Sequence, residues 1–405
     1  MEKNILIITD SYPPEVRSAS HLMKDLADGL KEKGHGVYVA TSFPKYNLAD
    51  EDKTIPLPKF AVEDGINVLR IRTLPHHRAN FVIRGVAQLT MPYIFFHAIK
   101  KNIKEKIDVV ILHSPPLPLT ISAYKTKKFY KAKYILNLHD FFPQNAVDLG
   151  ILKNKPIIKF FESMERKAYR NADLIVTPSG EHKNFLQNNR GVADKKIFVI
   201  PHWIDTKPFE RAKRTGKFRK LYGLENKLVF LFAGVLGPSQ GLDLIIRIAR
   251  NFKNNKEICF LFVGDGSDKN RLMELAKNYD LQNVIFKPFV SKEDYPELAK
   301  DSDVGVITLS AKNTTPAVPA KLLGYMAAAI PVVAFVHKES DIHRIVKEAD
   351  CGFTAISDND DKALAAVLKI YQERNKLKQY GENGFKYVLD NYTRKICIGK
   401  FEQLF

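Results

Sequence analysis

Short β-branched and aromatic runs alternate along this chain with amphipathic helical stretches, a pattern typical of βαβ units in a mostly parallel sheet. In the first half, strands are predicted at 4–9, 37–41, 66–72, 108–113, 133–138, 173–177 and 197–201. A second series is predicted at 227–233, 258–263, 283–287, 304–308 and 331–336, with helices such as 242–252 and 268–278 between its strands. Each half is therefore expected to be a Rossmann-like α/β domain.

The length of 405 residues exceeds one ordinary core and suits two domains of about 200 residues each. The segment 210–220 is basic and poor in β-branched residues, as expected of a linker or exposed helix. We therefore expect one domain at 1–205 and a second from 206 onward. Ligands bind outside the carboxyl ends of strands in open parallel sheets, so a cleft between the domains is the expected active site.

Composition excludes disordered and fibrous classes, since 45% of residues are apolar and 11% are aromatic. The three cysteines, Cys259, Cys351 and Cys397, have neither disulfide nor metal-ligand spacing and are predicted to be reduced core residues. The first ten residues enter an apolar strand directly and lack the features of a signal peptide. A location inside the cell is expected.

The net charge of +18 is uneven, because residues 78–133 carry eleven Lys or Arg against two acids. Within this block, 81–99 is long and apolar, but Arg84 and His97 argue against a membrane span. An interfacial helix pair on anionic lipid is the favoured interpretation. The alternative is core packing with a solvated basic face. Nucleic-acid binding is a third alternative, which no zinc, helix-turn-helix or RNA-binding signature supports.

The stretch 314–335 combines a polar loop, a proline-started helix and an apolar strand, which predicts an anion site. Pro319 suits the first helical position, where the amides of Ala320, Lys321 and Leu322 would point outward. The helix dipole and the Lys321 ammonium together suit the diphosphate of a nucleotide sugar, with Thr315 and Val318 in the adjoining loop. The alternative is a solvated lysine on an amphipathic helix.

Three further loops of the second half follow predicted strands. Gly234, Gln240 and Gly241 lie in the first, where backbone amides are expected to face a phosphate. Gly264 and Gly266 lie in the second, which can equally be a plain turn. Lys287, Pro288 and Phe289 lie in the third, whose backbone is expected to pair with the edge of a base.

Two loops of the first half carry candidate chemistry. Pro14, Arg17, Ser18 and Ser20 precede a helix expected at about 21–33 and form a candidate acceptor site, in which Arg17 would hold an anion such as a lipid phosphate. The serines can instead cap the helix. His139 and Asp140 end the fifth strand, where a carboxylate and an imidazole can bind or polarise a sugar hydroxyl. Their alternative is a helix cap and a surface histidine.

Metal binding is not expected. Acidic runs at 50–52, 301–303 and 358–360 have carboxylate spacing that can bind a divalent ion. An acidic surface loop, a turn before a strand and a helix cap explain them more simply.

Several ordered motifs resemble the family-4 retaining glycosyltransferases of the GT-B fold over nearly the whole chain. They are Y-P-P at 12–14, K-G-H-G-V at 33–37, D-L-I-V at 173–176 followed by Pro178 and Ser179, V-I-P at 199–201, F-A-G at 232–234, V-G-D-G at 263–266, and 321–334. Residues 41–46, 139–143 and 237–243 look like the branch of N-acetyl-L-fucosamine transferases of bacterial O-antigen and capsule assembly.

The resemblance implies transfer of a sugar, expected to be UDP-linked, from a nucleotide to a lipid-linked saccharide with retained configuration and without metal or cofactor. The second domain, 206–382, would hold the nucleotide and the first the acceptor. Lys321 would stabilise the leaving diphosphate, while Asp140 and His139 would orient the transferred sugar or the acceptor hydroxyl. A terminal helix, 383–405, would return to the first domain. The enzyme would work on the cytoplasmic face of the plasma membrane.

The chain also departs from the family pattern. Pro316 and Gly324 replace two glutamates of the donor loop and helix, and Val235 and Gln240 replace an arginine and a lysine that clamp the diphosphate. Ala329 replaces a usual glycine. Two further functions therefore stay open: a nucleotide-sugar 2-epimerase, which shares the fold, and a catalytically degenerate scaffold at the membrane.

Overall fold

A computed structural model describes residues 1–15, 17–44, 57–74, 81–312, 315–316 and 318–405. The chain separates into two compact units. The first comprises Met1–His202 together with Arg394–Phe405, and the second comprises Trp203–Thr393. The first unit thus ends three residues before the predicted boundary at 205, and the chain returns to it at its C-terminus.

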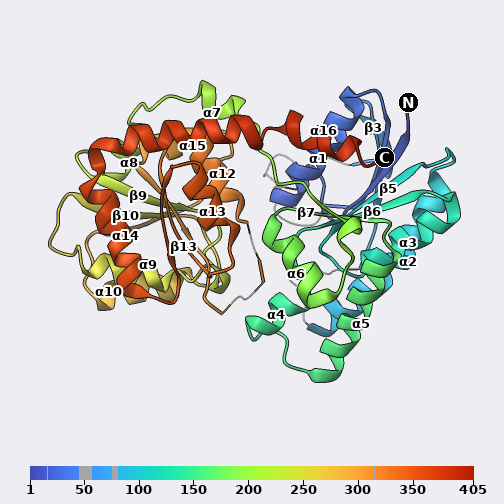
Figure 1. The fold of residues 1–405 in the computed structure, drawn as a ribbon, viewed down its shortest axis with the longest axis horizontal. Helices are drawn as coiled ribbons and strands as arrows, with labels where there is room; N and C mark the ends of the chain where they lie inside the picture. The colour runs from blue at the N-terminus through green and yellow to red at the C-terminus, as the bar shows by residue number, and fades with distance from the viewer. Residues whose placement is uncertain (16, 45–56, 75–80, 313–314, 317) are drawn as a thin grey trace. The chain divides into compact units, whose positions relative to one another are not determined.

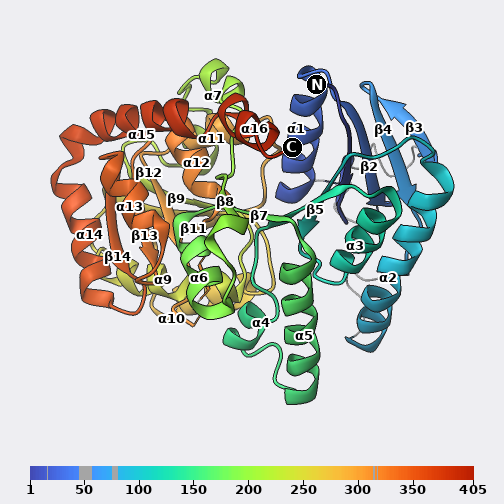
Figure 2. The same cartoon turned by 45° about the vertical axis from the view of Figure 1, so that its right-hand side comes forward.

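The first unit is an eight-stranded sheet with the order β3-β4-β2-β1-β5-β6-β7-β8 (Figures 1 and 2). Its strands are β1 Asn4–Ile8, β2 Gly36–Ser42, β3 Phe60–Glu63, β4 Ile66–Ile71, β5 Val109–Ser114, β6 Lys133–Leu138, β7 Leu174–Thr177 and β8 Ile197–Val199. Its helices are α1 Ser18–Glu32, α2 Phe81–Asn102, α3 Leu119–Tyr130, α4 Gln144–Asp148, α5 Lys155–Asn171, α6 Gly180–Arg190 and α16 Arg394–Glu402. Ile5, Leu6, Ile7 and Ile8 are all fully buried, so β1 is covered on both faces.

The second unit is a six-stranded sheet with the order β11-β10-β9-β12-β13-β14, parallel throughout its described pairs. Its strands are β9 Leu228–Ala233, β10 Ile258–Val263, β11 Val284–Lys287, β12 Val304–Thr308, β13 Val332–Val336 and β14 Gly352–Ile356. Its helices are α7 Lys207–Arg211, α8 Lys217–Tyr222, α9 Asp243–Arg250, α10 Lys269–Asn278, α11 Tyr295–Asp301, α12 Ala320–Ala327, α13 Asp341–Glu348, α14 Asp360–Gln372 and α15 Leu377–Asn391. Both units are Rossmann-like, which confirms the predicted fold class.

Every predicted strand is present within two residues of its expected ends, but two edge strands were not predicted. β3 is short, pairs antiparallel to β4 and has an alternating, largely exposed burial pattern. β14 begins at Gly352 and is only half buried. Neither strand shows the continuous apolar run by which the central strands were recognised.

The segment 210–220 is not a free linker. It spans the end of α7 and most of α8, and Phe209 and Phe218 are buried in a core of the second unit. Asp301 fixes this segment by accepting hydrogen bonds from the amides of Gly216 and Phe218 at 2.8 and 2.9 Å. The buried phenylalanines explain why a basic stretch packs on the sheet.

The expected single helix at 383–405 is two helices. α15 belongs to the second unit and ends at Asn391, whereas α16 belongs to the first and lies beside α1 (Figure 1). A Cβ at Gly29 of α1 would meet the Ile398 side chain, and Lys33 binds Glu402 at 2.6 Å. A small residue on α1 therefore permits the close approach of α16.

Helix α2 is one continuous helix and not the expected pair. Its residues Ala87, Met91, Phe95 and Ile99 are fully buried in the first unit, as the core-packing alternative requires. Val86, Leu89 and Tyr93 are exposed on its other side. Among the described residues, no helix is long and apolar enough to cross a membrane.

Candidate functional site

Lys321 lies in the first turn of α12, beside the loop that follows β9. Its Nζ donates a hydrogen bond to Oε1 of Gln240 at 2.9 Å and lies 4.9 Å from the centre of the Phe232 ring. Burial lowers the pKa of the Lys321 ammonium to about 8, because the charged form loses hydration. The solvated-lysine alternative is therefore wrong: this cation is held between an amide and an aromatic face.

Gly234 creates the space that Lys321 uses. A Cβ at position 234 would lie 2.6 Å from Cε of Lys321 and 3.2 Å from its Nζ. The φ of Gly234 is +143°, a conformation that other residues rarely adopt. The glycine thus lets the lysine side chain cross the end of β9.

The start of α12 differs in detail from its prediction. Pro319 is the N-cap residue with ψ 132° and not the first helical residue, and its carbonyl accepts a hydrogen bond from the amide of Leu322 at 3.1 Å. Leu322 is therefore not an outward donor. The amides of Ala320 and Lys321 remain at the helix start, while Val318 is half-buried and Thr315 is buried in the loop before it.

The amides of the glycines in these loops already donate to protein oxygens, contrary to the expectation that they face a phosphate. Those of Gly234 and Gly264 donate to the carbonyls of Val263 and Lys287, both at 2.9 Å. The amide of Gly266 donates to its neighbour Asp265 at 2.8 Å.

The amide of Gly241 donates to the carbonyl of Pro238 at 3.3 Å. Gln240 therefore brings its side chain, rather than its loop's backbone, to Lys321.

Close packing explains these glycines. A Cβ at Gly264 would lie 1.9 Å from the Gly234 carbonyl oxygen, and one at Gly266 would lie 2.2 Å from that of Leu236. The amide of Leu236 in turn donates to the carbonyl of Asp265 at 2.8 Å. The loops after β9 and β10 are thus packed backbone to backbone. This contact holds the backbone next to Lys321 in place.

The candidate base-binding residues lie at the end of β11, the edge strand next to β10: Lys287 is its last residue, and Pro288 and Phe289 follow it. Phe289 is half exposed and Pro288 is exposed, whereas the ammonium of Lys287 lies 5.0 Å from the centre of the Tyr222 ring. The parallel strands β9, β10 and β11 are neighbours. Their following loops therefore lie along one edge of the second sheet.

Gly324 is explained by Tyr295 of α11. A Cβ at position 324 would lie 2.6 Å from the Tyr295 hydroxyl oxygen, so the space of a larger side chain is already taken. The next residue, Tyr325, accepts a hydrogen bond from the amide of Ala233 at 3.0 Å. Tyr325 therefore ties α12 to the end of β9, while Tyr295 of α11 packs against the same helix at Gly324.

In the first unit, His139 belongs to a cluster of three histidines that the sequence analysis did not identify. Its Nδ1 lies 2.7 Å from Nε2 of His202, and the two rings stack with centroids 4.4 Å apart. The ring of His113 meets His139 edge-on at 4.4 Å. His113 lies near the end of β5, and His202 follows β8. The position of all three histidines at strand ends along one edge of the sheet is the signal by which the sequence could have predicted the cluster.

Burial lowers the pKa of all three imidazoles, because a charged ring would lose hydration and repel its neighbours. The pKa of His113 falls to about 3 and that of His202 to about 4. Asp140 next to them has an exposed side chain, yet the surrounding protein raises the pKa of its carboxyl group. The cluster is a neutral hydrogen-bonding group, so the alternative of a surface histidine does not describe His139.

The candidate acceptor residues are only partly accessible. Helix α1 begins at Ser18, three residues earlier than predicted, with Arg17 at the N-cap. Ser18 is exposed and Pro14 is half-buried, but Ser20 is fully buried and cannot reach an acceptor. Arg17 binds Asp10 at 3.3 Å, so an incoming anion would share this arginine with a carboxylate.

The acidic runs serve structural roles. Asp303 binds Arg219 at 2.6 Å, Asp360 binds Arg247 at 2.6 Å, and Asn359 caps α14. The run at 50–52 lies outside the described residues. Among the residues that are described, no group of three or more His, Cys, Asp or Glu is placed to hold a metal ion.

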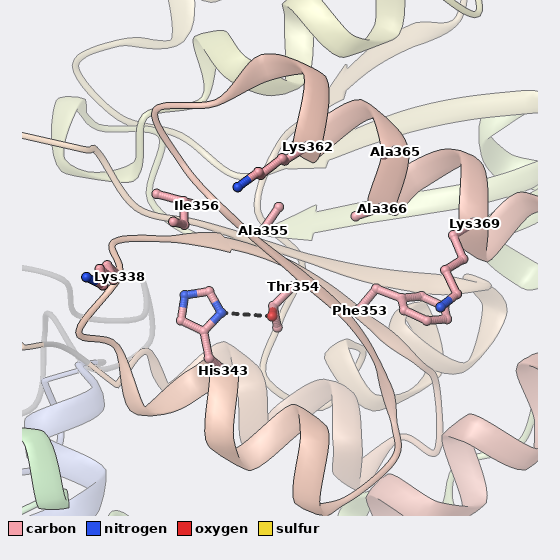
Figure 3. Close-up of a pocket in the computed structure, with 10 residues that line it drawn as sticks. All are labelled: Lys338, His343, Phe353, Thr354, Ala355, Ile356, Lys362, Ala365, Ala366 and Lys369. Atoms are coloured by element: carbon pink, nitrogen blue, oxygen red, sulfur yellow. Dashed lines mark hydrogen bonds between the residues drawn. The ribbon is translucent and has the colours of Figure 1, made fainter.

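An open hollow of about 610 Å³ lies beside edge strand β14, between α13 and α14 (Figure 3). Lys338 and Lys362 line it, Lys369 lies 4.6 Å from the centre of the Phe353 ring, and His343 binds the Thr354 hydroxyl at 2.8 Å. It contains none of the residues singled out from the sequence.

Comparison with known proteins gives two family matches. Residues 19–208 match Glycosyltransferase Family 4, and residues 214–387 match Glycosyl transferases group 1. The chain is 27% identical to the probable glycosyltransferase WbjE of Pseudomonas aeruginosa over 78% of this chain and 79% of that protein.

It is 23% identical to the putative colanic acid biosynthesis glycosyl transferase WcaI of Escherichia coli, over 80% of this chain and 81% of WcaI. The structure of Anabaena Alr3699/HepE in complex with UDP matches with a TM-score of 0.72 at 15% identity, covering 100% of this chain and 99% of that one. Since the two family matches together span most of the chain and the fold agrees, the chain belongs to the GT-B glycosyltransferases of family 4.

Proposed function

We propose that this glycosyltransferase moves a sugar from a UDP-linked donor to a lipid-linked saccharide, with retention of configuration, in surface polysaccharide biosynthesis. Lys321 carries the proposal. Its ammonium contacts a neutral amide and an aromatic ring, and among the described residues no carboxylate forms an ion pair with it. A half-buried cation without a counter-ion suits the charge that grows on a departing diphosphate.

The donor class has further support. HepE, a structural relative, was crystallised with UDP, with UDP and glucose, and with UDP-glucose. The loops after β9, β10 and β11, which hold Gln240 and Phe289, lie along the sheet edge where α/β folds bind ligands. N-acetyl-L-fucosamine or a related amino sugar is the proposed transferred group, on the resemblance of 139–143 and 237–243 to that branch of the family.

We assign His139 and Asp140 to the transferred sugar or the acceptor hydroxyl. The low pKa of His139 keeps its imidazole neutral near pH 7, so it can accept or donate one hydrogen bond without a charge. The adjacent Asp140 carboxylate can accept a hydroxyl hydrogen bond. No metal or cofactor enters the proposed reaction.

The membrane-facing surface is proposed on α2 and α3. Tyr93 and Phe129 are exposed there, with Lys125 lying 5.3 Å from the Tyr93 ring centre and Lys100 lying 5.2 Å from that of Phe129. Lys101, Lys104 and Lys106 add positive charge. Such a basic aromatic face suits the headgroup region of an anionic bilayer at the cytoplasmic side. Residues 78–80 of the predicted block lie outside the described residues.

A thermal-shift screen tests the donor proposal. A nucleotide sugar at 100 times its dissociation constant adds about 2.7 kcal/mol of stability, which is easily resolved. We expect UDP-sugars to raise the melting temperature more than other nucleotide sugars. Transfer to lipid-linked acceptors in anionic vesicles, with the product's anomeric configuration read by NMR, then tests the reaction. If no nucleotide sugar raises the melting temperature, the scaffold alternative replaces the enzyme.

A further inference from the structure

An apolar groove of about 470 Å³ lies in the first unit, walled by α2, α4 and α5. Its lining includes the half-buried residues Phe142, Ala146, Ile157 and Phe161. Of the residues that line it, Gln88 alone has a polar side chain. The volume lies within the range of about 300–1,000 Å³ that small-molecule sites occupy.

Large apolar side chains at the rim of the groove are exposed to solvent. Ile151 is 68% exposed and Phe160 is 48% exposed, and Leu89 is exposed on the opposite wall. Exposed apolar side chains gathered around one cavity indicate a binding surface, whereas isolated ones do not.

The segment that joins α4 to α5 and begins α5 is basic. Residues 149–161 contain Lys153, Lys155 and Lys159, and one acid flanks them on each side, Asp148 and Glu162. All three lysines are exposed, and the described residues provide no salt bridge to any of them. The groove therefore favours an apolar chain attached to an anionic group.

Phe142, which lines the groove, lies on the same loop as Asp140 of the proposed acceptor site. Phe142 follows Asp140 by two residues, so their Cα atoms lie at most about 8 Å apart. The Phe142 ring also packs edge-on against Phe161 of α5, with centroids 4.9 Å apart. One loop thus carries both a candidate sugar-binding carboxylate and the floor of the groove.

We propose that this groove binds the polyprenyl chain of the acceptor lipid and so presents its diphosphate-linked saccharide to Asp140. The identification of the chain rests on the proposed function, because a lipid-linked acceptor is part of it. Phospholipid acyl chains and a second copy of this protein are the competing occupants.

Calorimetric titration of the full chain with farnesyl diphosphate and isopentenyl diphosphate tests the proposal without any nucleotide. Both probes carry the same diphosphate, and we expect farnesyl diphosphate to bind about tenfold more tightly or better, because its longer chain buries more apolar surface. Phe160→Ser and Ala146→Phe should each remove most of this preference. Phe60→Ser is the matched control, since Phe60 is similarly exposed, at 42%, on β3 and outside the groove.

Equal affinity for the two probes, or groove variants that behave as Phe60→Ser does, would overturn the proposal. Binding to phosphatidylglycerol vesicles tests phospholipid acyl chains as the occupant, and sedimentation tests a second copy of this protein. If Phe160→Ser weakens vesicle binding or changes the oligomeric state while farnesyl diphosphate still binds normally, a bilayer or a second copy occupies the groove. Because no donor is present, failure here leaves the donor proposal intact.

Discussion

The ammonium of Lys321 donates a hydrogen bond to the side-chain oxygen of Gln240 at 2.9 Å, across the end of strand β9. A neutral amide orients the lysine without cancelling its charge. Gly234 leaves the space through which the side chain passes, and Phe232 provides the aromatic face beneath the ammonium. The arrangement keeps a full positive charge available at the start of α12.

Donor affinity is expected to fall at alkaline pH. Burial lowers the pKa of Lys321 to about 8, so the free enzyme loses this charge as the pH rises through that value. A diphosphate binds the charged form, and its affinity should therefore drop by up to about tenfold for each pH unit above 8. Calorimetry with UDP-glucose, whose phosphates stay ionised, checks this between pH 7 and 9.5. Lys321→Met should bind weakly with a flat profile, and a wild-type profile that is equally flat would refute the assignment.

Gly264→Ala is expected to destabilise the second unit. Its Cβ would lie 1.9 Å from the Gly234 carbonyl oxygen, so two loops must separate at a cost of about 3 kcal/mol or more. Gly237→Ala is the control, because its Cβ would meet only Val235 at 3.8 Å. Differential scanning calorimetry should show a lower melting temperature for the first variant alone. Equal melting temperatures would mean that the loops are not packed as described.

Restoring a glutamate at position 324 should not improve the enzyme. The new Cβ would lie 2.6 Å from the Tyr295 hydroxyl, and overpacking of this kind costs about 1–3 kcal/mol. We expect Gly324→Glu to melt at a lower temperature, and Tyr295→Ala in the same chain to recover part of the loss. Gly399→Glu on α16, where nothing lies within 4 Å of the Cβ, should melt as the wild type does. Wild-type stability of Gly324→Glu would contradict this explanation.

Acid should destabilise the protein partly through the histidine cluster. The pKa of His202 falls from 6.5 to about 4 on folding, so the unfolded chain binds more protons between these values. Stability is therefore full above pH 6.5 and is lost as the pH falls toward 4. The loss from His202 is about 3 kcal/mol. His202→Asn should show a shallower loss in melting temperature over this interval, and an unchanged slope would count against the buried neutral cluster.

Hydrophobic patterning was enough to predict the two sheets, because their central strands are apolar on both faces. β3 and β14 escaped prediction since edge strands are short and half solvated. The burial of Phe218 was also hidden, because a basic stretch around it reads as solvent-exposed. In each case tertiary packing, rather than local pattern, decides the structure.

The candidate site was predictable to the level of loops but not of atoms. Lys321 was recognisable because proline, lysine and an apolar strand follow each other in the sequence. The engagement of the glycine amides and the pairing of Arg17 with Asp10 depend on residues brought together by folding. His113 and His202 lie 26 residues before and 63 residues after His139, so only strand order could have joined them.

The most direct test of the central claim is calorimetric titration of UDP-glucose into Lys321→Ala and into Lys347→Ala, an exposed lysine of α13 that serves as control. Removing this half-buried cation should weaken donor binding by about 2 kcal/mol or more, roughly thirtyfold, because the diphosphate loses its charged partner. Lys347→Ala should bind as the wild type does. Unchanged affinity in Lys321→Ala, with its fold intact, would contradict the proposal that this lysine neutralises the diphosphate.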